Sequence, residues 1–237
     1  MLYCFGDSWG YGCELDLSYE VPFINVLAQK SNVEFTNYSE GGSALGKITH
    51  TVFLNTFKKE DFVVVVVPPD TRWYYENVHG GMSSLFVMSP THLSEMNDLY
   101  IKEFNHYIDT MSHKKMWFQY HTSLFIFSIQ QYLETTSTNY MFVHNYGQVT
   151  PFGVFDTIIK KDRFLDFNRS LTSLLTGVED EDIIKLNKDA PNPNIFIGEY
   201  FEGNGGHPNQ KGHIKISDMI YNTEVYQKWL NKDYLSI

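Results

Sequence analysis

Hydrophobic and polar positions in the first 67 residues alternate between strand and helix periods. Met1 to Phe5 is a short apolar run that predicts a strand, and Val21 to Gln29 carries apolar residues at helical spacing. Val33 to Tyr38 alternates like a strand, and a helix is expected to end near Phe57. Phe62 to Val67 is a β-branched run typical of a strand buried on both faces. Strands that alternate with helices predict a parallel sheet with helices on both sides.

The rest of the chain is less regular. Arg72 to Pro90 is aromatic, contains glycine and has no clear period, so it is interpreted as an inserted loop. The further expected elements are, in order, helices over Leu93 to Met111 and Met116 to Leu133, a strand at Tyr140 to Val143, a helix near Phe164 to Leu175, a strand at Ile195 to Ile197 and a helix from Ile216 to Leu230.

These elements predict one domain over residues 1–237, with an inserted loop and helix around 72–135. The fold class expected is α/β: a three-layer α/β/α sandwich of flavodoxin-like type, with a central parallel sheet of about five strands. No linker, internal repeat or low-complexity tract divides the chain.

The composition supports a packed fold and argues against two classes of binding partner. Hydrophobic residues make up 43% of the 237 residues and charged residues 19%. Eighteen Lys and Arg face 28 Asp and Glu, a net charge of -10, and no basic stripe appears, so neither nucleic acid nor an anionic membrane surface is an expected partner. The acidic run Glu179 to Asp182 is expected to be solvated surface.

Cysteine content and the N-terminus bear on the compartment. Cys4 and Cys13 are too few for a disulfide framework and lack metal-ligand spacing, so they are expected to be reduced, inert thiols. The first residues do not resemble a signal peptide, and the longest apolar run is far short of a membrane span. The expected location is cytoplasmic or phage-associated.

The stretch Gly6-Asp7-Ser8-Trp9-Gly10 follows the first predicted strand. A hydroxyl on a glycine-flanked turn at the carboxyl end of a strand is placed to act as a nucleophile. Gly-x-Ser-x-Gly also marks the nucleophile turn of α/β-hydrolases, but that fold has several strands before the turn, and only one precedes Ser8. Ser8 is the candidate nucleophile, and an ordinary Gly-Asp-Ser turn is the alternative.

The candidate partner of Ser8 lies near the other end of the chain, in the stretch Gly206-His207-Pro208-Asn209-Gln210-Lys211-Gly212-His213. An imidazole with a pKa near neutrality can take the Ser8 proton and return it to a leaving group. Pro208 suits the first turn of a following helix. His207 is therefore the candidate general base, with a plain loop histidine as the alternative, and His213 is expected to be structural.

These two blocks resemble the SGNH hydrolases, also called GDSL esterases, over the whole length of the chain. That family places its nucleophile in a Gly-Asp-Ser block at the end of the first strand. Its last block is Asp-x-x-His, commonly continued as Pro-Asn-x-x-Gly-His, and residues 207–213 match the continuation. The resemblance implies ester hydrolysis through an acyl-Ser8 intermediate, most often on small acyl esters such as O-acetylated carbohydrates or on lipid esters, with no metal or organic cofactor.

The last block departs from the family at Asn204, where the family has Asp. An amide can accept the imidazole N–H and orient the ring, but it cannot stabilise the imidazolium by charge. Two readings stay open: Asn204 orients His207, or Ser8 and His207 act as a dyad, with Glu202 or a backbone carbonyl as a substitute for the missing carboxylate.

The resemblance also implies an oxyanion hole. The spacing of Asn37 to Gly42 resembles the family's second block, Asn-x-Gly-x-x-Gly, which places one donor on Gly42. The Ser8 N–H would be another donor. The third block, Gly-x-Asn-Asp in the family, is replaced by Pro68 to Trp73, and Arg72 is the candidate third donor, a structural ion pair being its alternative. This stretch resembles phage-encoded members of the superfamily.

Gly41 to Lys47 also fits Gly-x-x-x-x-Gly-Lys between a strand and a helix, as in phosphate-binding loops. Ile48 stands where a Ser or Thr hydroxyl would hold Mg²⁺. A nucleotide-binding protein is therefore a second and less favoured functional class.

Aromatic residues flank the candidate catalytic loops. Trp9, Trp73 and Tyr74, with Tyr75, are candidates to stack on a sugar or line an acyl pocket, and plain packing is the alternative. The function favoured is ester hydrolysis on a small-molecule or glycan ester. Acyl transfer to an alcohol, and a catalytically weak or inactive glycan-binding or structural protein, are the other classes retained.

Overall fold

The computed structural model describes residues 1–13, 15–68, 72–76, 82–86, 114–146, 153–183, 198–202 and 206–233. Its strands are β1 (Leu2–Phe5), β2 (Phe35–Asn37), β3 (Phe62–Val67), β4 (Arg72–Glu76), β5 (Met82–Phe86), β6 (Asn139–His144), β7 (Phe201–Glu202) and β8 (His207–Pro208). Its helices are α1 (Ser8–Tyr11), α2 (Phe23–Ser31), α3 (Leu45–Phe53), α6 (Lys114–Thr135), α7 (Phe155–Ile158), α8 (Leu171–Thr176), α10 (Gln210–Tyr221) and α11 (Glu224–Leu230), with a 3₁₀ turn at Lys161–Arg163.

Four parallel strands form the central sheet in the order β2-β1-β3-β6. In the register of the sheet Leu2 lies beside Phe35 on one side and Phe62 on the other, and Phe62 lies beside Asn139. Every residue of β3 is buried, as its continuous valine run predicts for an inner strand. The expected α/β sandwich is confirmed, with four strands among the described residues instead of about five.

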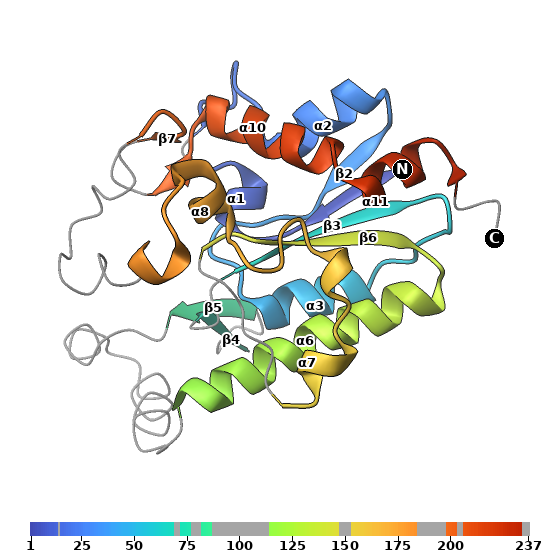
Figure 1. Ribbon diagram of the computed structural model, residues 1–237, viewed down its shortest axis with the longest axis vertical. Helices are drawn as coiled ribbons and strands as arrows, with labels where there is room; N and C mark the ends of the chain where they lie inside the picture. Colours follow the sequence, from blue (N-terminus) through green and yellow to red (C-terminus); the bar gives the residue numbers. More distant parts are fainter. Residues whose placement is uncertain are drawn as a thin grey trace.

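Helices cover both faces of the sheet, and each face has its own apolar core. α2, α10 and α11 lie on one face, and α3 and α6 lie on the other (Figure 1). Side chains of β3 alternate between the two cores: Val64 and Val66 pack toward α2 and α10, whereas Val63 and Val65 pack toward α3 and α6. The period of two in a fully apolar strand therefore divides one run of valines between two layers.

The order of the strands identifies one edge of the sheet as the place for a site. β1 leads into α2 on one face, and β3 is followed along the chain by α6 on the other. Neighbouring parallel strands whose connections diverge in this way leave a crevice beyond their carboxyl ends, which is where ligands bind in open α/β sheets. Ser8 lies in the turn just after β1, so it lies at this edge.

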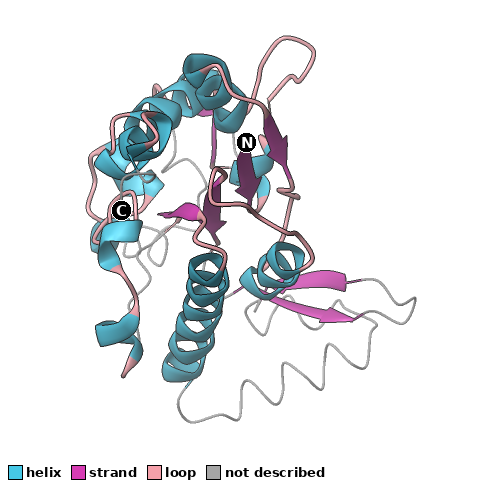
Figure 2. Ribbon diagram, turned by 90° about the vertical axis from the view of Figure 1, so that its right-hand side faces the viewer, coloured by secondary structure: helices cyan, strands magenta, loops and turns pink. Residues whose placement is uncertain are grey.

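Three sequence-based expectations differ from the structure. Residues 72–76 and 82–86 form an antiparallel hairpin, with Arg72 beside Phe86, where a loop was expected; β4 lies next to α3 (Figure 2). The helix expected near Phe164 to Leu175 begins only at Leu171. The C-terminal helix is two helices, because Thr223 caps a new one with its side chain.

Two expected elements, the helix over Leu93 to Met111 and the strand at Ile195 to Ile197, lie outside the described residues. The other helices and strands expected from periodicity are present within a few residues of their predicted ends. No helix in the described part of the chain has the length and apolar character needed to cross a membrane.

Candidate active site

Ser8 is the first residue of α1, a single helical turn at the carboxyl end of β1. Asp7 caps this turn: its backbone is extended, and its side chain accepts a hydrogen bond from the Trp9 N–H at 3.1 Å. Asp7 is fully buried, and Ser8 is 6% exposed. The nucleophile candidate is thus held on a short, capped and nearly buried turn.

Glycines on both sides of Ser8 permit close packing. A Cβ on Gly6 would lie 2.7 Å from the Cβ of Val66 in β3, and a Cβ on Gly10 would collide with the Ser39 hydroxyl. Neither glycine has the positive φ that only glycine adopts readily. The two glycines therefore serve close contact with β3 and with the chain after β2.

The segment after β2 is bonded to the Ser8 turn. The Asn37 side chain donates to the Gly10 carbonyl at 2.9 Å, and the Glu40 N–H donates to the Gly6 carbonyl at 3.1 Å. Gly42, two residues further, has a φ of 78°, which favours glycine, and no atom outside its immediate neighbours would meet a Cβ there. The candidate oxyanion donors Ser8 and Gly42 therefore belong to two joined loops.

His207 lies in β8, which pairs antiparallel with β7 so that His207 is beside Glu202. Gly206 has a φ of 70°, a left-handed conformation that sets the direction in which the chain enters β8. Asn209 then caps α10 by accepting the Gly212 N–H, and its amide donates to the Glu199 and Phe201 carbonyls. Pro208 was expected in the first turn of the helix, but it lies in the strand because Asn209 is the cap.

His213 has the structural role expected of it. Its Nδ1 accepts the Phe23 N–H at 3.1 Å, which ties the first turn of α2 to α10, and its ring stacks on Phe23. Burial, and secondly the nearby His207, lower the pKa of His213 to about 4. The imidazole is therefore a neutral acceptor inside the core.

Gly212→Ala is expected to destabilise the protein by about 1–3 kcal/mol, the usual range for overpacking a close contact. The added methyl would meet the Tyr200 carbonyl and lie 2.8 Å from the Pro208 Cβ. Urea unfolding at pH 7 measures the loss. Gly198→Ala is the control, because a Cβ at Gly198 meets nothing within 4 Å. Equal stability of the two variants would show that the Gly212 contact relaxes freely.

The two ends of the chain that carry Ser8 and His207 meet in the fold. α1 packs against β8, and the rings of Trp9 and Phe201 lie edge to face, 6.0 Å apart. The hydrogen bonds among the described residues do not include one between the Ser8 hydroxyl and the His207 imidazole. Catalytic hydrogen bonds often tighten only around bound substrate, so the pairing stays a prediction.

The structure describes the other predicted site residues to different extents. Asn204 lies outside the described residues. Arg72, Trp73 and Tyr74 are in β4, where the backbone alone is described. Trp9 is 5% exposed and belongs to the core between the sheet and α2, so its ring serves packing, the alternative to substrate binding that the sequence left open.

Two buried polar residues near this edge, Asn145 and Asp180, were not predicted from the sequence. Asn145 follows β6, is 1% exposed, and donates from its amide to the Asp7 carboxylate at 2.6 Å. Asp180 belongs to the acidic run expected at the surface, but it is 6% exposed and accepts hydrogen bonds from the Ser170 N–H and hydroxyl. The position of Asn145 just beyond the carboxyl end of a buried strand was the available signal.

His144, the last residue of β6, is buried against Phe164 at a ring distance of 4.8 Å. Neither of its nitrogens makes a hydrogen bond to a residue that the structure describes. Burial lowers its pKa to about 3, so the ring is neutral at physiological pH. Burial also raises the pKa of the Cys4 thiol to about 12, in keeping with the expected inert cysteine.

The phosphate-loop alternative finds no support in the local contacts. The Lys47 ammonium is paired with the Glu40 carboxylate, and Ile48 is buried in the core. A phosphate-binding lysine must instead reach toward the ligand. No cluster of three or more His, Cys, Asp or Glu side chains suited to a metal occurs within the described ranges.

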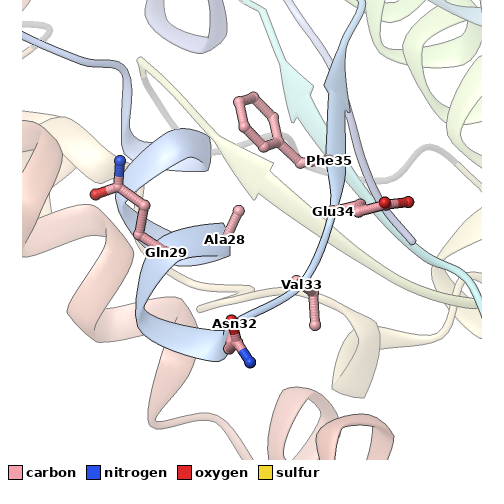
Figure 3. A pocket seen from close by; sticks show the side chains of 6 residues that line it. All are labelled: Ala28, Gln29, Asn32, Val33, Glu34 and Phe35. Carbon is pink, nitrogen blue, oxygen red and sulfur yellow. The ribbon is translucent and has the colours of Figure 1, made fainter.

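A cavity of about 340 Å³ lies at the opposite edge of the sheet, between the end of α2 and the start of β2. Its lining residues are Ala28, Gln29, Asn32, Val33, Glu34 and Phe35. The Gln29 and Glu34 side chains point away from each other (Figure 3). A binding site needs polar groups that converge, so this hollow is not the candidate site.

No protein-family model and no curated protein matches the sequence. Among solved structures, the chain is similar to the acetyl xylan esterase AlAXEase, with 13% identity, 94% of this chain and 98% of that chain covered, and a TM-score of 0.47. It is also similar to the esterase EstA from Pseudoalteromonas, with 11% identity, 97% of this chain and 98% of that chain covered, and a TM-score of 0.44. A third similar structure is a lipolytic protein of the G-D-S-L family from Veillonella parvula. It has 13% identity, 94% of this chain and 97% of that chain are covered, and the TM-score is 0.40.

Proposed function

We propose that this protein is a serine ester hydrolase of SGNH type. Ser8 attacks the ester carbonyl while His207 takes its proton, and the tetrahedral intermediate collapses to an acyl-Ser8 ester as His207 protonates the leaving alcohol. Water, deprotonated by His207, then attacks the acyl group, and the proton returns to Ser8. The Ser8 and Gly42 N–H groups bind the oxyanion, with Arg72 as a third donor.

The observation that carries this proposal is the packing of α1 against β8, which brings together the parts of the chain that hold Ser8 and His207. These elements lie about two hundred residues apart in the sequence, beyond the reach of local structure. The turn with Ser8 also lies at the sheet edge where open α/β folds bind ligands. Asn204 is retained as the residue that orients His207, and a Ser8–His207 dyad as the alternative.

The small exposed fraction of Ser8, 6%, favours a small acyl group, because a long chain needs an open groove to reach the hydroxyl. An O-acetylated carbohydrate or a comparable small ester is the substrate class proposed. Transfer of the same acyl group to an alcohol needs no other residue and differs only in what attacks the acyl enzyme.

A second candidate is a weakly active or inactive protein of the same fold that binds glycans. It is favoured by Asn204, which stands where a carboxylate is expected. Loss of the carboxylate in a serine-histidine triad lowers turnover by roughly 10⁴.

A fluorophosphonate probe distinguishes these candidates, since it phosphonylates only an activated serine. We expect the folded wild-type protein to be labelled, with the added mass on the peptide that contains Ser8, and to hydrolyse p-nitrophenyl acetate. A heat-unfolded sample is the control and is expected to remain unlabelled. Absence of label from folded protein after prolonged incubation would refute the hydrolase proposal and favour the glycan-binding one.

A further inference from the structure

The Asp7 carboxylate is buried beside Ser8, and its two oxygens have different partners. Oδ1 accepts the Trp9 N–H at 3.1 Å, and Oδ2 accepts the Asn145 amide at 2.6 Å. Asp7 is fully buried, and an ionised carboxylate is costly to bury without such donors. Both bonds help to fix how the carboxylate is turned.

Asn145 is itself firmly held. Its N–H donates to the Val67 carbonyl at 3.1 Å, which extends the ladder between β3 and β6 by one residue. Its carbonyl accepts the Thr172 N–H at 3.2 Å and the Thr172 hydroxyl at 2.9 Å, and its side-chain oxygen accepts the Tyr146 N–H at 2.6 Å. The amide therefore meets Asp7 from a rigid support.

The orientation of Asp7 matters because of the N–H groups at the start of α1. A capping carboxylate bonds N–H groups in the first turn of a helix, and here it takes that of Trp9. The Ser8 N–H makes no hydrogen bond within the described part of the chain. A carboxylate released from the Trp9 N–H could swing closer to the Ser8 N–H and place negative charge where the oxyanion forms.

We infer that Asn145 is a positioning residue of the nucleophile turn. By holding one oxygen of Asp7, it keeps the carboxylate on the Trp9 N–H and leaves the Ser8 N–H for the oxyanion. Asn145 thus joins the carboxyl end of β6 to that of β1 across the intervening end of β3. This inference rests on the proposed esterase function and adds a residue on which that function depends.

The test is Asn145→Ala, assayed well below its melting temperature. We expect the rate of fluorophosphonate labelling and the kcat for p-nitrophenyl acetate to fall about 10- to 100-fold, with KM changed less than about threefold, because misplacement of reacting groups by about 1 Å can cost 10²-fold. If Asn145→Ala does not fold, Asn145→Ser is used, since it keeps a short donor that does not reach Asp7.

Thr172→Val is the matched control. It removes the buried hydroxyl bond to the Asn145 carbonyl and leaves the Asn145–Asp7 bond in place. We expect it to lower the melting temperature and to keep the labelling rate within about twofold of wild type, since a single lost hydrogen bond costs about 1 kcal/mol of stability.

The outcomes separate the two proposals. Labelling of folded Asn145→Ala or Asn145→Ser at the wild-type rate would overturn the positioning role and leave the esterase proposal intact. An equal slowing in Thr172→Val would also overturn it, because general loosening would then explain both. A wild-type protein without label would instead remove the esterase proposal.

Discussion

Ser8→Ala and His207→Ala are each expected to reduce ester hydrolysis by about 10⁴- to 10⁶-fold, and the double variant is expected to be no slower than either alone. The reason is that a nucleophile and its general base act as one unit, so removing either already removes the covalent route. The measurement is the steady-state kcat of wild type, both single variants and the double variant, with p-nitrophenyl acetate at pH 7.5. Additive losses would mean that the two residues act independently, which contradicts the proposed mechanism.

Matched controls for these variants use a serine and a histidine on the surface. Ser18→Ala and His50→Ala remove the same side-chain types at exposed positions, and both should keep kcat within about twofold of wild type. Circular dichroism and urea unfolding establish whether each variant is folded. A His207→Ala variant with wild-type activity would identify His207 as an ordinary loop histidine, the alternative that its sequence context left open.

The sequence predicted the layered fold well because buried strands and helices have characteristic patterns of apolar residues. A run of five valines after Phe62 predicted an inner strand, and the long, largely apolar stretch from Met116 to Leu133 predicted the helix α6. The hairpin of β4 and β5 was missed, since a run of consecutive aromatic residues at Trp73 to Tyr75 lacks the alternation of apolar and polar positions that marks a half-buried strand.

Site residues could be predicted where they belong to a short sequence motif. A single polar residue outside any motif could not be recognised. The stretches around Ser8 and His207 could be read as a nucleophile and a base, but Asn145 is one asparagine after a strand. Its role depends on a contact with Asp7, 138 positions away, which no local pattern contains. Trp9 shows the converse: its place beside Ser8 in the sequence suggested substrate contact, whereas the turn of α1 directs the ring into the core.

Acid is expected to destabilise the protein steeply because two buried histidines stay neutral when folded. His144 and His213 have pKa values lowered to about 3 and about 4, whereas an unfolded chain has histidine pKa values near 6.5. Between about pH 6 and pH 4.5 the unfolded state therefore binds about two more protons than the folded state. These two histidines should lower the free energy of unfolding by about 2 to 2.5 kcal/mol for each pH unit in this window, and they should contribute little slope above about pH 7.5.

His144→Leu isolates one of the two protons. The leucine side chain is close in volume to the imidazole and suits the apolar surroundings of Phe164 and Phe167. Urea unfolding of the variant should lose about 1.4 kcal/mol less than wild type for each pH unit between pH 6 and pH 4.5, since carboxylates contribute equally to both proteins. Parallel pH profiles for wild type and His144→Leu would show that His144 titrates normally in the folded protein, and so that it is not enclosed at the end of β6.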